Sequence, residues 1–304
     1  MNLSKRNKIM EKKNKIDLFG ASALIGFSLI LGINHIVIKL VNSGFNPIFF
    51  AGLRSIIAFL FLITLMKLLK KPVYFNKEYI FISILAGIVF ALEFLFLFLA
   101  LDLTSVSRNS IIYYSMPVWL SIFAHFFIPN EKLNTIKIIG LISAFTGVTL
   151  SIVNSENDLS FTNDIFLGDI FAFLSALTWA LIILLVKGTK FNQVSPEMQL
   201  IWMVMVSGPV LILFSLIFWD PIRDFQIIHI WGLLFQSVIV VAGGFLFWLW
   251  LLAVYPASGV ASFSFLTPIF TIFFGWLILN ETLNSNFLFA AFMVVMGLIF
   301  INKN

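Results

Sequence analysis

The chain has 304 residues, of which 61% are hydrophobic and 11% are charged, and its formal net charge is +5. Soluble domains are about half apolar and a quarter charged, so this composition excludes an ordinary soluble enzyme and a disordered protein. The positive residues lie at the ends of apolar runs, which also argues against nucleic-acid binding. The chain has no cysteine, so it can form neither a disulfide, a catalytic thiolate nor a cysteine-based zinc site.

Ten apolar runs of about the length of a bilayer-spanning helix follow one another along the chain. They lack the period-two alternation of outer-membrane strands, so we predict an all-α integral membrane protein. The first run follows a basic stretch but is too long for a signal peptide, and we interpret it as a retained helix. The predicted transmembrane helices are 18–40, 47–66, 79–100, 106–127, 135–153, 167–187, 197–219, 230–253, 259–279 and 286–301.

The distribution of lysine and arginine orients the predicted helices in the membrane. If the N-terminus is cytoplasmic, fifteen of the nineteen positive residues lie on the cytoplasmic side. Lys39, Arg108 and Arg223 lie outside, and Arg54 falls within a span. This bias requires an even number of spans. We therefore expect both termini in the cytoplasm, in a multi-pass protein of the cell (inner) membrane.

The second half of the sequence repeats landmarks of the first half in the same order. Gly20 and Lys39 are nineteen residues apart, as are Gly168 and Lys187. The chain therefore divides into a basic N-terminus (1–17), a first five-helix repeat (18–153), an outer loop (154–166) and a second five-helix repeat (167–301). Further matched landmarks are Pro117 and Pro268, Glu131 and Glu281, and Gly147 and Gly297.

Each repeat contains five spans, and an odd number has a topological consequence. The second repeat must enter the membrane in the direction opposite to the first. Inverted repeats of this kind are common in secondary transporters, whose binding site lies near the membrane midplane between the halves. The sequence therefore predicts ten transmembrane helices arranged as two inverted five-helix repeats.

These motifs together resemble the drug/metabolite transporter superfamily, specifically its ten-helix EamA-type branch. Residues 31–39 are similar to the first-helix signature of that family, with Leu31 in place of the usual tryptophan, and 179–187 keep the tryptophan in the second repeat. Ala51-Gly52-Leu53-Arg54 is similar to the second-helix motif, and the stretches from Pro117 and Pro268 to the following glutamates resemble its fourth and ninth helices. The resemblance implies solute transport, often export of amino acids or other metabolites, without a bound cofactor.

Two charged residues fall deep within predicted spans. A charge at the centre of a span costs about 3 kcal/mol or more, so Arg54 and Glu93 are expected to face the bundle interior or an aqueous cavity. They could bind the two ends of a zwitterion such as an amino acid. Alternatively, Glu93 could carry a coupling proton, because removal from water favours the neutral form of a carboxyl group. A purely structural role in joining helices is the third alternative.

Several polar and aromatic residues share the interior of the predicted spans. Asn109 and Tyr113 lie one helical turn apart and therefore on one face. These side chains could line a solute cavity or serve helix packing alone. The three histidines are not at metal-ligand spacing beside a carboxylate, so we predict no metal site. With Arg54 and Glu93, the candidate solute-binding residues are Asn34, His35, Asn109, Tyr113, Tyr114, Trp179 and Trp248.

Helix kinks and gates are also suggested by the repeat. Pro117 and Pro268 cannot donate a backbone hydrogen bond, so each is expected to bend its helix. The inversion places Lys39 and Glu281 at the outer end, and Lys187 and Glu131 at the inner end. We expect each lysine to pair with its glutamate, one pair forming as the other opens; four unpaired interfacial charges are the alternative.

The function that the sequence favours is secondary transport of a small organic metabolite, amino acid-like, by an exporter or exchanger with alternating access between the halves. The alternatives are a membrane-embedded enzyme acting on lipid-linked substrates and a membrane sensor without transport. The sequence shows no convergent catalytic residues and no nucleotide-binding motif, so we predict no enzyme activity and no cofactor. The expected partners are a small-molecule solute and the lipid bilayer; coupling to protons and assembly into a homo-oligomer are left open.

Overall fold

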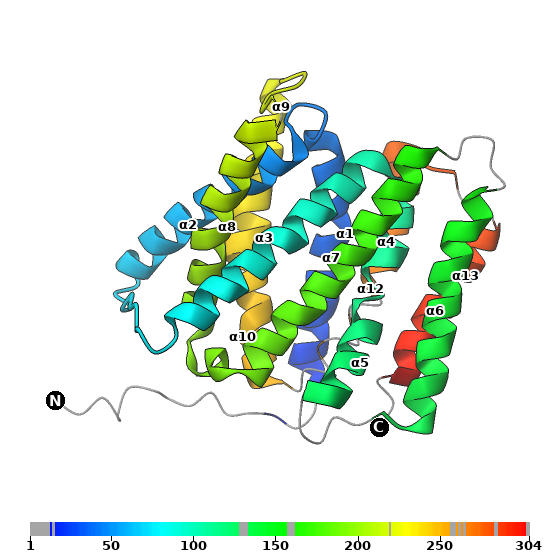
Figure 1. Cartoon of the computed structure of the whole chain (residues 1–304), viewed down its shortest axis with the longest axis horizontal. Coiled ribbons are helices and arrows are strands. Elements are labelled where there is room, and N and C mark those ends of the chain that lie inside the picture. The colour runs from blue at the N-terminus through cyan, green and yellow to red at the C-terminus, as the bar shows by residue number, and fades with distance from the viewer. Residues whose placement is uncertain are drawn as a thin grey trace.

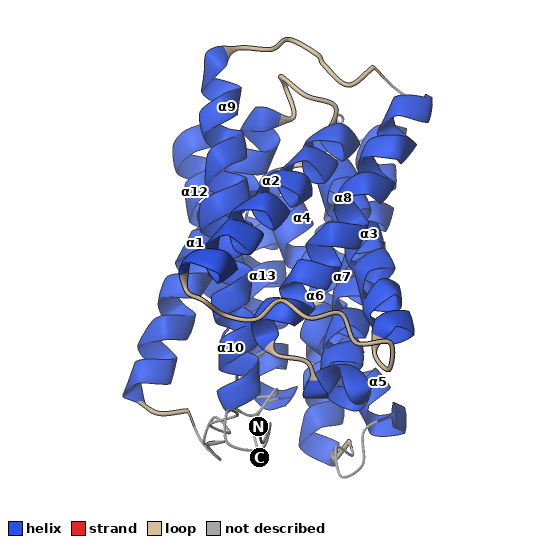
Figure 2. Cartoon of the chain, turned by 90° about the vertical axis from the view of Figure 1, so that its left-hand side faces the viewer, coloured by secondary structure: helices blue, strands red, loops and turns tan. Residues whose placement is uncertain are grey.

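The computed structural model describes residues 13, 16–127, 133–156, 162–218, 220–255, 260, 263, 266–282 and 285–301. Within these residues the chain is a bundle of long, tilted helices (Figure 1). Figure 2 shows helices and connecting loops but no strand in the described part of the chain. The ten predicted spans are all represented, and the protein is an all-α membrane protein.

The helices of the first repeat follow the predicted spans closely. The third and fifth helices extend three residues beyond the predicted ends, and the fourth span is divided into two short helices. The elements are α1 (Leu18–Val41), α2 (Pro47–Leu68), α3 (Ile80–Leu103), α4 (Val106–Tyr113), α5 (Met116–Phe127) and α6 (Thr135–Glu156).

The helices of the second repeat follow the same order in the opposite direction. The third span of this repeat has a π-helical segment in its middle. A short 3-10 helix, η2 (Lys190–Gln193), joins the first two. The elements are α7 (Asn163–Gly188), α8 (Pro196–Phe218), α9 (Ile227–Leu234), η3 (Phe235–Phe245, the π-helical segment), α10 (Leu246–Val254), α12 (Leu266–Leu279) and α13 (Ser285–Ile301).

Length and apolarity agree with membrane insertion. Seven spans, counting α4 with α5 and α9 to α10 as single spans, are long and apolar enough to cross a bilayer. The other three spans contain the shorter apolar helices Thr135–Gly147, Leu266–Leu279 and Leu288–Gly297. Large apolar side chains such as Phe81 and Ile217 are exposed on the outside of the bundle, as expected for a surface that faces lipid.

Side-chain caps fix where several helices begin. Asp17 accepts a hydrogen bond from the amide of Gly20 at the start of α1, and Ser105 accepts one from Arg108 at the start of α4. Asn46 caps α2, whose first residue is Pro47. Each cap satisfies an amide that the helix itself leaves without a partner, so the polar connections between spans determine the helix ends.

Two predicted spans are not the continuous helices that the sequence indicated. The fourth breaks at Tyr114 and Ser115, and Pro117 lies in the first turn of α5, where its missing amide costs nothing. The eighth begins at Ile227, earlier than expected, and η3 interrupts it. Pro268 likewise lies in the first turn of α12, but the preceding serines that the expected kink would involve lie outside the described residues.

The two repeats meet through helices of the same rank and through others, such as α3 with α7 and α1 with α12. α2 packs against α8, α4 against α12, and α6 against α13, and the last pair lies side by side at one edge of the bundle (Figure 1). Gly147 lies against Ala290, and Gly297 against Ala144, so α6 and α13 run antiparallel. Contacts between corresponding helices are expected when two inverted halves are related by an axis in the membrane plane.

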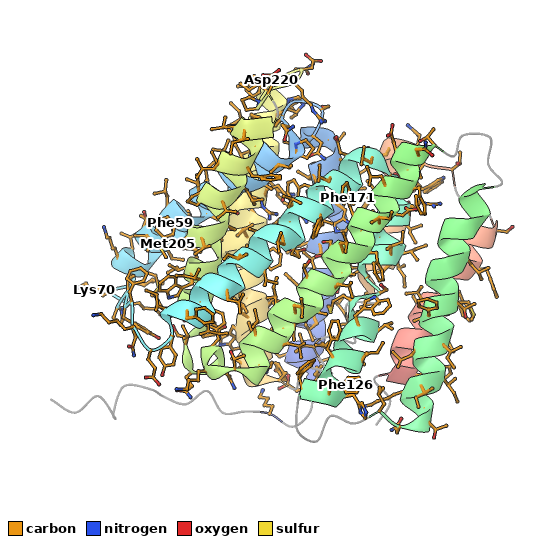
Figure 3. The ribbon with its side chains drawn as sticks, in the orientation of Figure 1. Phe59, Lys70, Phe126, Phe171, Met205 and Asp220 are labelled. Atoms are coloured by element: carbon orange, nitrogen blue, oxygen red, sulfur yellow. The ribbon has the colours of Figure 1, made fainter. Side chains whose placement is uncertain are left out.

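The bundle has two ends, which differ in the elements that form them. The terminal end is where α1 begins and α13 ends, and the distal end is the opposite one. Figure 3 shows Phe126 at the terminal end and Asp220 at the distal end. The same view shows Phe59 and Met205 close together where α2 passes α8.

Candidate functional site

Arg54 and Glu93 lie inside the bundle, and their side chains have different neighbours. Their exposed fractions are 0% and 2%. One carboxylate oxygen of Glu93 accepts a hydrogen bond of 2.7 Å from the Tyr113 hydroxyl. The guanidinium of Arg54 instead donates to the side chain of Gln236 at 3.2 Å. The two charges therefore lie in one buried region without forming an ion pair with each other within the described residues.

Gln236 joins Arg54 to the first helix. Its amide donates to the side-chain oxygen of Asn34 at 2.5 Å and to the Asn34 carbonyl at 3.2 Å. Gln236 belongs to η3 in the second repeat, whereas Arg54 and Asn34 belong to the first repeat. The contact therefore crosses the interface between the halves and fixes the position of Arg54.

The guanidinium of Arg54 packs against two aromatic rings. Its central carbon is 3.8 Å from the ring centre of Phe94 and 4.8 Å from that of Phe98, which are cation–π contacts. Nε and one terminal nitrogen have no hydrogen-bond partner among the described residues. Leaving buried donors unpaired is costly, so these groups are suited to bind a solute or water.

An aromatic stack lies next to Glu93. The rings of Tyr113 and Trp179 are nearly parallel, with centres 4.8 Å apart and an interplanar angle of 18°. Trp179 is 6.2 Å from Trp248 and 5.7 Å from Tyr114. These residues come from α4, α7 and α10 and from the break after α4, so both repeats contribute to the stack.

His35 completes the cluster on the side of the first helix. Its ring stacks on that of Tyr114 at 5.5 Å, and its Nδ1 is 3.4 Å from the side-chain nitrogen of Asn109. Each of the nine predicted solute-binding residues thus has a hydrogen bond or ring contact with another member once Gln236 is included. Together they form the central cluster: Asn34, His35, Arg54, Glu93, Asn109, Tyr113, Tyr114, Trp179, Trp248 and Gln236.

Two small cavities border the paired tryptophans. One, lined by Glu93 and Tyr113 among others, has a volume of about 10 Å³. The other, lined by Ser28 and Thr267 among others, has a volume of about 20 Å³. Trp179 and Trp248 line both. A single water needs roughly 10–15 Å³, so the halves are closed around the cluster in this conformation.

Sequence reasoning missed several members of this region. Gln236 is the important one, and its signal was the presence of one amide in the otherwise apolar eighth span. Ser175 donates to the backbone carbonyl of Glu93 at 2.9 Å, and only the fold reveals this contact. The π-helical turn around Gln236 was not predicted; such turns frequently occur at functional sites.

The distal gate residues do not pair as the sequence suggested. Lys39 donates to the carbonyl of Thr104 at 2.9 Å and lies 3.4 Å from that of Asp102. Glu281 accepts from the amides of Val106 and Ser107 at 2.7 and 3.0 Å. Within the described residues there is no direct ion pair between them. The reason is that the end of α3 offers carbonyls that attract a cation, while the start of α4 offers amides that attract an anion.

The terminal gate is described only in part. Lys187 donates to the carbonyl of Leu252 in the last turn of α10, at the position that corresponds to the contact of Lys39 with the end of α3. Glu131 lies outside the described residues, and so does its expected pairing with Lys187. The two lysines therefore have equivalent backbone contacts in the two repeats.

The cluster offers groups for binding and for proton exchange. It combines one carboxylate, one guanidinium with open donors, one imidazole and large aromatic walls. Among the described residues, no three metal-ligating side chains lie together in a way that could hold a metal ion. The arrangement is chemically suited to hold a small molecule that carries both a cationic and an anionic group.

Comparison with known proteins identifies similar chains. The profile of the EamA-like transporter family matches residues 18–153 and 166–303. The uncharacterized transporter YoaV of Bacillus subtilis is 26% identical over 281 residues, which cover 92% of this chain and 94% of that protein. The uncharacterized transporter YvbV of the same organism is 28% identical over 297 residues, with 92% and 90% covered.

Two further similarities are to a plant protein, in sequence, and to a solved structure, in fold. A WAT1-related chloroplastic protein of Arabidopsis thaliana is 26% identical over 268 residues, which cover 84% of this chain and 63% of that protein. A protein of known crystal structure superposes with a TM-score of 0.69 over 92% of this chain and 97% of its own, at 16% sequence identity. At that identity the superposition speaks for the fold alone.

Proposed function

The chain belongs to the EamA-like transporter family, and from this we propose that it moves a small amphoteric metabolite, amino acid-like in its charges, by secondary transport. That it is a multi-pass membrane transporter follows from the family and from the ten spans. The solute class and the mechanism are the proposal.

The observation that carries the proposal is the composition of the central cluster. Groups of opposite charge, Arg54 and Glu93, are buried in one region, and within the described residues they do not neutralise each other through a salt bridge. Buried charges are costly unless they are paired or used. A solute that carries both charges would supply the missing partners: its anionic group would meet the open donors of Arg54 or His35, and its cationic group would meet Glu93.

The mechanism proposed is alternating access between the two inverted halves, 18–153 and 167–301. The cluster draws on both halves, through Tyr113 from one and Trp179, Gln236 and Trp248 from the other. Rocking of the halves would therefore expose the same groups to each side in turn. With the basic terminal end in the cytoplasm, as the lysine and arginine bias favours, the protein would act in the cell membrane as an exporter or exchanger.

Glu93 has a second proposed task, which is to carry a proton. The Tyr113 hydroxyl is within 2.7 Å of its carboxylate and can follow a change in its protonation. A proton and a cationic solute would then compete for one carboxylate, which is the simplest arrangement for exchange between them. Transport without coupling needs no such group, so the role of Glu93 can be tested separately from transport itself.

The direct test is uptake by proteoliposomes that contain the purified protein. The vesicles are offered a mixed pool of amino acids and small metabolites, with and without a proton gradient, and their contents are read by mass spectrometry against empty vesicles. We expect selective accumulation of amphoteric compounds. Accumulation restricted to uncharged sugars or hydrocarbons would contradict the proposed solute class.

A pair of variants then tests the site. Glu93→Gln keeps the size of the side chain and its bond to Tyr113 and removes the charge, so we expect transport to fall and its dependence on pH between about 5 and 8 to disappear. Glu78→Gln is the matched control, because Glu78 lies at the terminal end in an exposed pair with Lys190. Unchanged transport by Glu93→Gln across this pH range would remove Glu93 from the mechanism.

A further inference from the structure

The start of α4 is held by carboxylates of the other repeat. Glu281, which follows α12, accepts hydrogen bonds from the amides of Val106 and Ser107 at 2.7 and 3.0 Å. Asp169 of α7 binds Arg108 through two contacts of 2.7 and 2.8 Å at Nε. Both carboxylates belong to the second repeat and α4 belongs to the first. Their contacts therefore close the interface between the halves at the distal end.

Local backbone geometry places Glu281 on α4. Asn280 has a positive φ of 55°, a conformation that reverses the chain after a helix. The Glu281 amide then donates back to the carbonyl of Gly275 at 3.2 Å. A side chain at Gly275 would have its Cβ 2.9 Å from both the Glu281 carboxylate and the Ser107 hydroxyl. The close approach of the three groups thus depends on glycine at this position.

A row of buried polar side chains runs inward from this contact between α4 and α12. At its distal end Ser107 meets Gly275, and at its inner end the Tyr114 hydroxyl lies beside that of Thr267. Ser110 and Thr271 lie between them by helical spacing, since residues three and four apart share a face. The serines and threonines of this row are each at most 3% exposed: Ser107, Ser110, Thr267 and Thr271.

Several hydroxyl groups in this row lack a hydrogen-bond partner, and the row ends at the central cluster. The hydroxyls of Ser107, Ser110 and Thr271 have no partner among the described residues. Buried hydroxyls are normally paired, so unpaired ones between two closed halves indicate a surface that is solvated in another conformation. Thr267 lines the cavity beside Trp179 and Trp248, which connects the row to the solute site.

We propose that Glu281 is the distal latch of the transporter, and that the hydroxyl row behind it is the path of the solute between the central cluster and the distal end. This rests on the proposed transport function and adds the route and its gate. Release of the Glu281 carboxylate from the α4 amides separates α4 from α12 and exposes the row. The hydroxyls then replace the water around the charged groups of a polar solute as it passes.

The latch differs from an ion pair between Lys39 and Glu281 in a way that can be tested. The carboxylate is held by the amides of Val106 and Ser107, while Lys39 is held by carbonyls at the end of α3. Exchanging the two charges would place a cation on amides and an anion on carbonyls. The double substitution Lys39→Glu with Glu281→Lys should therefore open the distal end rather than restore closure.

The natural lack of cysteine makes a direct test available. A single Ser110→Cys substitution places one thiol in the middle of the row, in the full chain reconstituted in proteoliposomes. Its modification by a membrane-impermeant, positively charged methanethiosulfonate reagent is followed by mass. We expect slow labelling of Ser110→Cys alone. Labelling should be about tenfold faster when Glu281→Gln or Gly275→Ala is added, because charge-assisted bonds to the amides are lost or forced apart.

Matched controls separate the latch from general loosening. Glu78→Gln removes a charge at the terminal end, and Gly26→Ala adds a methyl group that meets nothing within 4 Å; neither should speed labelling. Ala144→Cys, buried between α6 and α13, should stay slow in the Glu281→Gln background. Equal acceleration at Ala144→Cys would overturn the proposal, as would unchanged labelling of Ser110→Cys in both latch variants or restored closure in the charge-exchanged pair.

The outcome is independent of solute identity, because labelling needs no solute. Faster labelling by latch variants of a protein that transports nothing would leave the latch in place and reject the transport proposal. Transport by the wild-type chain with no response of Ser110→Cys to either latch variant would reject the latch alone.

Discussion

The distal and terminal ends of the bundle are closed by different kinds of contact between the halves. At the distal end Arg108 and Asp169 form a buried ion pair, with side chains 5% and 2% exposed, and Glu281 binds backbone amides. Backbone hydrogen bonds also join the turn 43–46 to residues 221–224. Arg223 and Asp102 add an ion pair whose side chains are 39% and 20% exposed, so the Arg108–Asp169 pair is the buried part of these contacts.

The described ion pairs between the halves at the terminal end lie closer to solvent than the Arg108–Asp169 pair does. Lys71 pairs with Glu197 at 2.5 Å, and Lys190 pairs with Glu78 at 3.4 Å with side chains 67% and 51% exposed. Exposed pairs contribute about 0–1 kcal/mol, whereas removing one partner of a buried pair costs roughly 3–5 kcal/mol. Within the described residues, the buried Arg108–Asp169 pair therefore makes the distal end the more strongly held of the two.

The largest expected effect comes from the buried pair. Asp169→Ala removes the buried carboxylate to which Arg108 donates, so we expect a loss of about 3 kcal/mol or more of unfolding free energy. The measurement is unfolding of the purified protein in mixed micelles, followed by tryptophan fluorescence. Glu78→Ala at the terminal end is the control and should cost less than about 1 kcal/mol. Equal losses in the two variants would abolish the difference between the ends.

A pair of glycines offers an intermediate effect without changing any charge. A Cβ on Gly44, in the distal turn, would overlap the imidazole ring of His229, whereas one on Gly188, at the terminal end, would meet nothing within 4 Å. We expect Gly44→Ala to destabilise the protein by about 1–3 kcal/mol through overpacking. Gly188→Ala should be neutral or stabilising by up to about 1 kcal/mol. The same unfolding measurement compares them, and a neutral Gly44→Ala would show that the distal turns are loosely docked.

Much of the fold follows from the sequence for a simple physical reason. In lipid, backbone groups must bond within their own helix, so long apolar runs determine both the number and the type of the elements. The breaks were harder to predict. Pro117 was expected to bend one continuous helix, but the helix is already interrupted at Tyr114 and Ser115, and Pro117 lies in the first turn of the next helix. Nothing in the apolar run 230–253 indicated the π-helical turn.

The sequence predicted which residues form the central cluster better than it predicted which of them contact one another. Burying Arg54 and Glu93 in a membrane is costly enough for composition alone to single them out. Their partners depend on how helices distant in the sequence are brought together, so Gln236 for Arg54 and Tyr113 for Glu93 required the structure. The expected ion pair between Lys39 and Glu281 differs from the observed contacts for a related reason. The prediction matched each charge with an opposite charge, although the amides and carbonyls at helix ends compete equally well for charged side chains.

The smallest expected effect tests whether the exposed terminal contacts depend on pH. Asp17 caps α1 at the terminal end and binds Lys13 and the Tyr255 hydroxyl, the latter at 2.7 Å. The hydrogen bond from Lys13 holds the pKa of Asp17 well below its ordinary value, with help from the Gly20 amide and Tyr255. The folded state therefore binds this proton less readily than the unfolded state does.

Stability from this contact is fully present above the ordinary pKa of aspartate, about 4, and is lost as the pH falls below it. We expect the unfolding midpoint of the wild-type protein to decline between about pH 5 and pH 3, and Asp17→Asn to make that decline shallower. Asp102→Asn is the distal counterpart, since Asp102 binds Arg223 at 2.7 Å, and its effect on the midpoint at neutral pH should be the larger. A decline as steep in Asp17→Asn as in the wild type would show that the start of α1 is not held by this carboxylate.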